Sequence, residues 1–247
     1  MPMTTQLQIL YEDEHVLAVN KPPGLLVIPG GEADEQTLKD LVAEYLAPRG
    51  ERPFVVHRLD RGTSGVVLFA RNAAAHRALN LAFDHRAVKK GYLALVDGDL
   101  QGEHVIQIPL HAARRGKMRP AGRGEPGLRS HTRWRAVERF ERFTFLEVEP
   151  FTGRQHQIRV HLKAIGHPLA FDPLYGRKTP LLARDLNPAA AHPDVPALAR
   201  TPLHAAWIRV PHPTRTEPLV VEAPLPDDVR QVLTLLRASG QRLRRAT

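Results

Sequence analysis

Apolar and polar residues alternate along this chain with two different periods, which predict where helices and strands form. In residues 37–47 the apolar positions Leu38, Leu41, Val42 and Tyr45 have the i, i+3, i+4, i+7 spacing of a helix with one buried face. The same reasoning predicts helices from Asn72 to about Asp84, from Gln155 to Ile165 and after Pro226.

Short runs rich in β-branched and aromatic residues predict strands. Two of them enclose the acidic turn Glu12–Glu14. Others are expected at Phe54–His57, Gly65–Ala70, Lys90–Asp97, Gly102–Ile108, Ser130–Glu138, Phe143–Glu149, Ala205–Val210 and Leu219–Glu222. Because these runs cluster like hairpins and do not alternate regularly with helices, we expect an α+β fold with a mixed, mainly antiparallel sheet and flanking helices. No internal repeat or linker is evident, so residues 1–247 are expected to form a single domain.

Two further segments have more specific predictions. Thr152 and Gln155 have capping-box spacing at the start of the third helix, which Gly166 is expected to end. Residues Thr179–Pro202 are rich in Pro and Ala and show no clear period, which predicts a surface excursion.

Composition narrows the class of protein. Hydrophobic residues make up 43% and charged residues 25%, which is typical of a globular chain. The absence of cysteine excludes disulfides, thiolate nucleophiles and Cys-based zinc sites. No apolar run is long enough to span a membrane, and the first residues do not resemble a signal peptide, so we expect a cytoplasmic protein. The formal net charge of +9 favours polyanionic partners.

The positive charge is concentrated in one segment. Residues 112–142 hold ten basic and three acidic residues, and nine of the ten are Arg. A solvated basic surface would account for such a run, but the planar guanidinium suits phosphate contacts, so we favour a nucleic-acid face. The candidate RNA-binding residues of this basic loop are Arg114, Arg115, Lys117, Arg119 and Arg123.

Several familiar motifs are absent or misleading. Gly122–Gly127 spells G-x-G-x-x-G, but no βαβ unit surrounds it and Pro126 opposes the helix that would bind a pyrophosphate, so we interpret it as a flexible basic loop. His156 and His161 are five residues apart, a poor fit to one helix face, and no metal site is expected. Ser64 lies between Thr63 and Gly65 and is interpreted as a turn hydroxyl rather than a nucleophile.

Two dense polar segments remain. His57–Gly65 places one carboxylate, Asp60, in a loop between two apolar strands, where a rigid scaffold can present it to a cleft. Thr152–His161 puts cations and amides on a helix, and Arg159 is a reasonable partner for a partly buried Asp60. From the residues alone, a structural turn and an ordinary ion pair remain alternatives for these two segments.

These segments, HRLDRGTSG and TGRQHQIRVHLKAIGHPL, together with Asp172–Gly176, closely resemble the RluA-type pseudouridine synthase family. The opening ILYEDEHVLAVNKPPGL and the Lys90-Gly91-Tyr92 strand also look like family motifs, so the resemblance covers about residues 7–225. It implies the pseudouridine synthase fold with an active-site cleft at its centre.

The resemblance also implies roles for individual residues. Asp60 would be the catalytic aspartate, Tyr92 would stack on the target uracil, Arg159 would pair with Asp60, and Arg58 would enter the RNA and help to displace the flipped nucleotide. A base must leave its stack before chemistry can reach it, and an aromatic face with a cation suits its reception. No cofactor and no metal is implied.

Two features depart from the family pattern. Many relatives carry a small RNA-binding domain before the catalytic one, but here the motifs begin within ten residues of Met1, so we expect none. Phe171 stands where the family usually has Gly before Asp172, and we expect local repacking without loss of chemistry.

The sequence therefore predicts an RNA pseudouridine synthase that acts on ribosomal or transfer RNA as a monomer, without a membrane or an obligate protein partner. The alternative is a non-catalytic RNA-binding protein that retains the fold, although binding a polyanion needs no carboxylate. A glycosidase-like enzyme is a weaker alternative, because such enzymes normally use two carboxylates and only Asp60 has a motif context.

Overall fold

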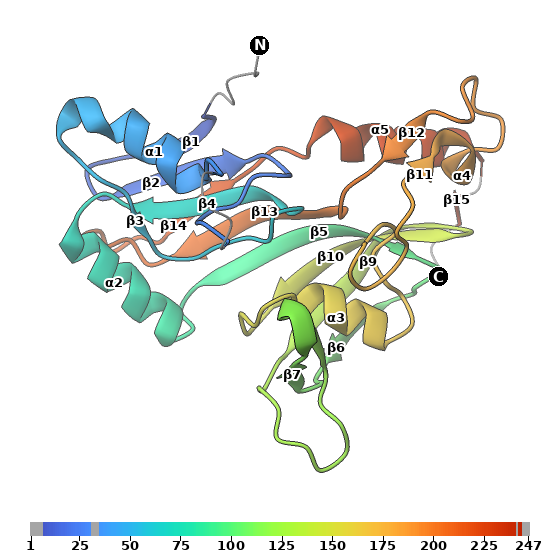
Figure 1. The fold of residues 1–247 in the computed structure, drawn as a ribbon, viewed down its shortest axis with the longest axis horizontal. Coiled ribbons are helices and arrows are strands. Elements are labelled where there is room, and N and C mark those ends of the chain that lie inside the picture. The colour runs from blue at the N-terminus through green and yellow to red at the C-terminus, as the bar shows by residue number, and fades with distance from the viewer. Residues whose placement is uncertain (1–6, 31–34, 241, 244–247) are drawn as a thin grey trace. The chain divides into compact units, whose positions relative to one another are not determined.

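The computed structural model describes residues 7–30, 35–240 and 242–243, and the side chains of Arg115 and Arg242 lie outside the described part (Figure 1). Contacts divide the chain into two compact units. Unit 1 contains the chain up to Lys90 and the stretch Ala205–Pro224, and unit 2 contains Gly91–His204 and the chain from Leu225 onward. Each unit is therefore built from two stretches that are far apart in the sequence.

Unit 1 contains an antiparallel sheet. Its strands are β1 (Ile9–Glu12), β2 (Val16–Lys21), β3 (Phe54–Val55), β4 (Ser64–Ala70), the greater part of β13 (Leu203–Val210) and β14 (Leu219–Glu222). The order is β1-β2-β4-β13, with β3 paired to β4 and β14 paired to β13. Strand β4 is buried along its whole length, as a central strand covered on both faces should be.

Two helices complete unit 1, and both begin at the residues that the sequence predicts. Helix α1 (Leu38–Leu46) starts at a capping box between Thr37 and Asp40, and a 3-10 turn, Ala47–Arg49, follows it. Helix α2 (Ala73–Asp84) starts at Asn72, whose side chain accepts from the backbone N–H of Ala75. Helix α2 packs on the sheet through a core that includes Leu79, Leu68 and Val210.

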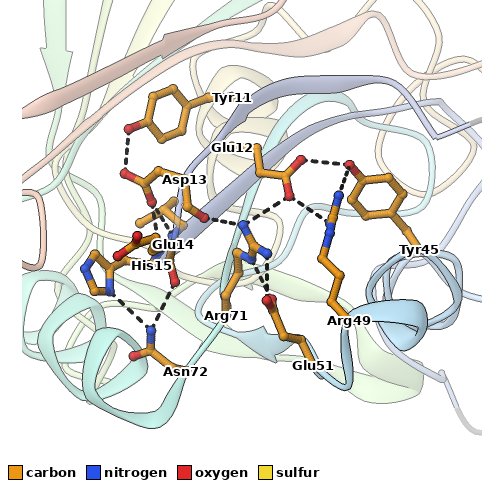
Figure 2. Close-up of polar contacts among 11 residues, drawn as sticks. Tyr11, Glu12, Asp13, Glu14, His15, Tyr45, Arg49, Glu51, Arg71 and Asn72 are labelled. Atoms are coloured by element: carbon orange, nitrogen blue, oxygen red, sulfur yellow. Dashed lines mark hydrogen bonds and ion pairs between the residues drawn. The ribbon is translucent and has the colours of Figure 1, made fainter.

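A polar network fixes the turn between β1 and β2 (Figure 2). The Asp13 carboxylate accepts from Tyr11 at 2.6 Å and from the backbone N–H groups of His15 and Val16 at 2.9 and 2.8 Å. Beside it, the Glu12 carboxylate accepts from Tyr45 at 2.7 Å and from Arg49 at 2.9 Å, and it also contacts Arg71 at 3.0 Å. Arg71 in turn donates to Glu51 and to the carbonyl oxygen of Asp13.

Unit 2 contains a second antiparallel sheet. Its strands are β5 (Lys89–Asp97, of which Lys89 and Lys90 belong to unit 1), β6 (Glu103–Ile106), β9 (Thr132–Phe140), β10 (Phe143–Pro150) and β15 (Arg242–Leu243). The order is β5-β10-β9-β15, and β6 also pairs with β9. Two small two-stranded sheets accompany it: β7 (Leu110–Ala112) with β8 (Met118–Pro120), and β11 (Leu181–Leu182) with β12 (Pro196–Leu198).

The helices of unit 2 are α3 (Gln157–Ala164), the short α4 (Ala183–Leu186) and α5 (Asp227–Ala238). The expected stripe of α5 is buried, and Val232 and Leu236 lie in the core of unit 2. The core also takes in Leu181, Leu186 and Leu198, so the expectation that Thr179–Pro202 is only a surface excursion is wrong. Single apolar residues of that segment pack in the core, but their spacing has neither the period of a helix nor that of a strand.

The predicted start of α3 is also wrong. The helix begins at Gln157, two residues later than expected, and His156 precedes it with a left-handed backbone (φ 53°). The Gln157 side chain satisfies the preceding loop instead, because its oxygen accepts from the Thr152 hydroxyl at 2.7 Å and from the N–H of Arg154 at 3.0 Å. Gly166 ends the helix as predicted, with φ of 88°.

The predicted fold class is confirmed as α+β with a mainly antiparallel sheet. None of the helices in residues 7–30, 35–240 and 242–243 is both long and apolar enough to cross a bilayer.

Candidate active site

The loop that carries Asp60 connects β3 to β4 and is held by its own turn. The backbone N–H of Thr63 donates to the carbonyl oxygen of Asp60 at 3.0 Å, which closes a four-residue turn. Leu59, Thr63 and Ser64 are buried, whereas Arg58 is exposed and Asp60 is half-buried. The loop thus fixes its backbone while it leaves the Arg58 and Asp60 side chains within reach of solvent.

A buried lysine holds this loop from the side, and the sequence analysis did not identify it. Lys21 ends β2 with no exposed surface, and its ammonium group donates to the carbonyl oxygens of Pro22, Leu25 and Arg61 at 2.8, 2.7 and 3.2 Å. The N–H of Gly24 donates to the same Arg61 oxygen at 2.8 Å. A buried ammonium group is tolerated where several oxygens replace its water, so Lys21 fixes the backbone directly after Asp60.

The far end of the loop is fixed by a close backbone approach. Gly65 starts β4 with φ of 113°, and a Cβ atom placed there would lie 2.1 Å from the carbonyl oxygen of Ala205 in β13. Only glycine satisfies both the backbone angle and this contact.

His57, three residues before Asp60, has a structural role. Its Nε2 atom accepts from the backbone N–H of Leu68 in β4 at 3.0 Å and so attaches the start of the Asp60 loop to this strand. Burial, with a smaller contribution from the charge of Lys90, lowers the pKa of His57 to about 3. The ring is therefore neutral near pH 7 and cannot supply a cation beside Asp60.

In unit 2, Arg159 projects from α3 into a buried ion pair. Its Nε and Nη2 atoms donate to the two carboxylate oxygens of Asp172 at 2.8 and 2.7 Å. Asp172 also accepts from the N–H groups of Leu174 and Tyr175 at 3.0 and 3.2 Å, and the guanidinium lies 5.1 Å from the Tyr175 ring centroid. The fork geometry fixes the guanidinium plane. The expected pair between Arg159 and Asp60 stays a prediction.

Tyr175 links this pair to the predicted basic loop. Its hydroxyl oxygen accepts from the N–H of Met118 at 2.8 Å and lies 2.7 Å from Nδ1 of His156. Met118 begins β8, so this hydroxyl links the hairpin of β7 and β8 to His156 at the start of α3. Figure 1 shows the hairpin beside α3. The sequence predicts only a flexible basic loop in this region.

The candidate RNA-binding cations differ in their surroundings. Arg114 and Arg123 are exposed, and Lys117 is half-buried. Arg119 forms a two-point ion pair with Glu125, whose carboxylate also accepts from the N–H of Gly122 at 2.8 Å. The Arg115 side chain lies outside the described part. The G-x-G-x-x-G stretch follows an antiparallel hairpin and not the parallel strand of a βαβ unit.

Tyr92 lies in β5 opposite Val148 of β10 and is 9% exposed. Phe171 packs in the core of unit 2, and the neighbouring Asp172 pairs with Arg159. The expectation that Phe171 causes local repacking without loss of chemistry stays a prediction. Asp60 and Arg58 belong to unit 1, and Tyr92, Arg159 and the basic loop belong to unit 2.

Within the described ranges, no group of three or more His, Asp or Glu side chains has an arrangement that could hold a metal ion.

Comparison with known sequences identifies the pseudouridine synthases as relatives of this chain. The family model described as RNA pseudouridylate synthase matches residues 15–164. A ribosomal large subunit pseudouridine synthase D from Nitrosomonas europaea is 38% identical over 235 residues, which are 94% of this chain and 65% of the relative. A ribosomal large subunit pseudouridine synthase C from Escherichia coli O157:H7 is 39% identical over 93% of this chain and 70% of the relative. The chain therefore spans about two thirds of the length of these relatives.

Solved structures show the same fold. Human RNA pseudouridylate synthase domain containing 4 superposes with a TM-score of 0.74 at 24% identity, over 97% of this chain and 95% of that one. Human RNA pseudouridylate synthase domain containing 1 superposes with a TM-score of 0.67 at 25% identity, over 94% of this chain and 95% of that one.

Proposed function

This chain belongs to the RNA pseudouridylate synthase family, and from that premise we propose that it isomerises uridine to pseudouridine in ribosomal RNA. The relatives named for the ribosomal large subunit favour the RNA of that subunit over transfer RNA. The observation that carries the proposal is the position of Asp60, on a loop whose backbone is held by Lys21 and by its own turn.

The reaction is balanced without any other reactant. The bond between N1 of uracil and C1′ of the ribose breaks, and a bond between C5 and C1′ forms. C5 loses a proton to solvent and N1 takes one up, so the product is an isomer of the substrate. We propose that the Asp60 carboxylate is the group that acts on the reacting atoms.

Other residues bind and orient the target nucleotide in this proposal. Tyr92 stacks on the uracil, Arg159 pairs with Asp60, and Arg58 enters the RNA in place of the flipped nucleotide. The two-point bond to Asp172 supports the role of Arg159, because it sets the guanidinium orientation before substrate arrives. The exposure of Arg58 supports its role.

We place the basic hairpin, with Arg114, Lys117 and Arg123, in contact with RNA phosphates. Arg115 belongs to the same proposal. Arg119 contributes less, because Glu125 already neutralises it. We further propose that residues 1–247 act as one catalytic domain, as a monomer in the cytoplasm.

Pseudouridine mapping tests the proposal. Cells that lack the gene receive wild-type protein or Asp60→Asn, and their ribosomal and transfer RNAs are mapped chemically. We expect a large-subunit site that disappears on deletion and returns only with wild type. No change at any site would refute the proposal and favour an RNA-binding protein without catalysis.

Tyr92 can be tested separately. Tyr92→Phe keeps the ring and should keep much of the turnover, whereas Tyr92→Ala should lose more. Equal losses would argue against stacking.

A further inference from the structure

Two residues other than glycine have positive φ in the described part of the chain, Arg86 (57°) and His156 (53°). His156 has a visible reason, because its ring contacts the Tyr175 hydroxyl. Arg86 is exposed, and its side chain makes no ion pair or hydrogen bond in the described structure. Strained residues without a structural partner point to function.

The strain at Arg86 can be compared with another helix of the same protein. Helix α2 ends with the N–H of Arg86 bonded to Phe83 and that of Ala87 bonded to Ala82. Helix α3 ends with the same pair of bonds, but the left-handed position is Gly166. Glycine is the usual residue there, because a side chain costs stability in that conformation. The left-handed conformation of Arg86 therefore lowers the stability of the end of α2, whereas the glycine at the end of α3 avoids this loss.

Lys90, four residues later, carries a second cost. It is half-buried, and its ammonium group lies 5.7 Å from the Phe83 ring centroid. No carboxylate pairs with it among the residues that the structure describes, and burial lowers its pKa. A desolvated cation without a counter-ion is unfavourable unless a ligand supplies the charge.

Lys89 and Arg209 meet in a cavity of about 270 Å³ within unit 1. Ala87, Val210, Pro211 and Pro218 complete its lining. Next to Pro211, the buried His212 has its Nε2 atom 2.8 Å from the Asp13 carboxylate, which attaches this side of the cavity to the turn between β1 and β2. Two exposed cations thus line one cavity.

Arg52, Arg58 and Arg77 of unit 1 form no ion pair in the described structure. Carboxylates do neutralise four other arginines of this unit, Arg49, Arg61, Arg71 and Arg215. In contrast, the described structure gives none to Arg86, Lys89, Lys90 or Arg209, although Asp84, Glu217 and Glu222 lie in the same or neighbouring segments. The charge of these four residues, which we call the connector cations, is left uncompensated.

We propose that the connector cations bind phosphates of the substrate RNA outside the target nucleotide. This inference rests on the proposed function, which supplies a polyanion whose successive phosphates can satisfy several cations at once. Phosphate contacts fix the register of a protein on nucleic acid without reading sequence, so these residues position the substrate.

Arg86→Gly gives the sharpest test, because it removes the charge and relieves the strain together. We expect the Tm to rise by about 1 to 3 °C and the slope of log Kd against log salt for a ribosomal RNA transcript to become shallower by about 0.7 to 0.9. A residue with only a structural role would not move stability and binding in opposite directions. An unchanged slope would overturn the role of Arg86.

The double variant Lys89→Gln/Arg209→Gln tests the cavity. The salt slope should become shallower by about 1.5 to 2, and KM for the transcript should rise while kcat changes by less than about twofold. Arg49→Gln removes one paired cation from the same unit and is the matched control, with no change expected in slope or KM. Equal effects of the control and the double variant per charge removed would mean that net charge alone matters and would refute the inference.

The two proposals fail in different ways. If the wild-type protein forms no pseudouridine but the salt slope still depends on these residues, the proposed function is refuted and phosphate binding by the connector cations is supported. If the wild-type protein is active and the variants change neither the salt slope nor KM, phosphate binding by these cations is refuted and the proposed function is supported. Tighter binding to anionic vesicles or acidic peptides than to RNA, lost in the same variants, would also overturn it.

Discussion

Two loops of unit 1 carry an aspartate, and different groups hold the backbone around each of them. In the turn between β1 and β2, the Asp13 carboxylate itself holds the backbone, through the N–H groups of His15 and Val16 (Figure 2). In the loop before β4, the backbone around Asp60 is held by the Lys21 ammonium group and the Thr63 N–H.

This difference separates a structural acid from a candidate catalytic one. The Asp13 carboxylate is engaged by Tyr11, two backbone N–H groups, His212 and Arg215, so its loss should cost stability. The Asp60 loop has supports of its own, so the loss of its carboxylate should cost turnover instead. Four substitutions test the comparison.

Asp60→Asn should have the largest effect. We expect turnover to fall by at least about a thousandfold, with RNA affinity nearly unchanged, because a carboxylate does not bind phosphate. Turnover and filter binding on the same preparation measure the two quantities. A loss of stability with turnover retained would reverse the comparison.

Lys21→Met should come next, because it removes the ammonium donor from three carbonyl oxygens, of which only that of Arg61 keeps the second donor described above, the N–H of Gly24. We expect unfolding to be easier by about 2 kcal/mol and turnover to fall as the Asp60 loop loses its position. Denaturant unfolding and turnover at a temperature where the variant is folded separate the two effects. A fully active variant would show that the hydrogen bonds of the Lys21 ammonium group do not position Asp60.

Asp13→Asn should destabilise by about 1 to 2 kcal/mol at pH 7, with little change in turnover per folded molecule. Burial raises the pKa of Asp13, but hydrogen bonds from Tyr11, His15 and Val16 outweigh it and lower the pKa well below its usual range. The stability from this group is therefore present above the unfolded pKa of about 3.9 and is lost as the pH falls below it. Melting curves should show the gap between wild type and variant narrowing below about pH 4, and a constant gap would contradict this account.

Arg49→Gln should have the smallest effect. Its pair with Glu12 is solvent-exposed, and Glu12 keeps Tyr45 and Arg71 as partners. We expect the Tm to stay within about 1 °C of wild type. A larger drop would mean that the network in Figure 2 acts cooperatively.

Elements defined by local rules could be predicted from the sequence. Helix α1 lies within the predicted range 37–47, Asn72 caps α2 as expected, and β14 has the predicted bounds, Leu219–Glu222. These features depend on residues within a few positions of one another. Asp60 could also be singled out, because its motif is contiguous.

Features that depend on distant partners were missed. The start of α3 is set by His156, whose left-handed backbone accompanies a contact to Tyr175, 19 residues away. The burial of Lys21 depends on an oxygen 40 residues away. Neither relation has a signal in residue type or period, and only the folded chain brings the groups together.

Release of label from C5 shows whether Asp60 carries out the isomerisation. A large-subunit ribosomal RNA transcript carrying tritium at C5 of its uridines is incubated with wild type or Asp60→Asn at protein concentrations that saturate binding. Wild type should release tritium in step with pseudouridine formed, and Asp60→Asn should bind the transcript equally well and release none above background. Release by Asp60→Asn at close to the wild-type rate would contradict the account.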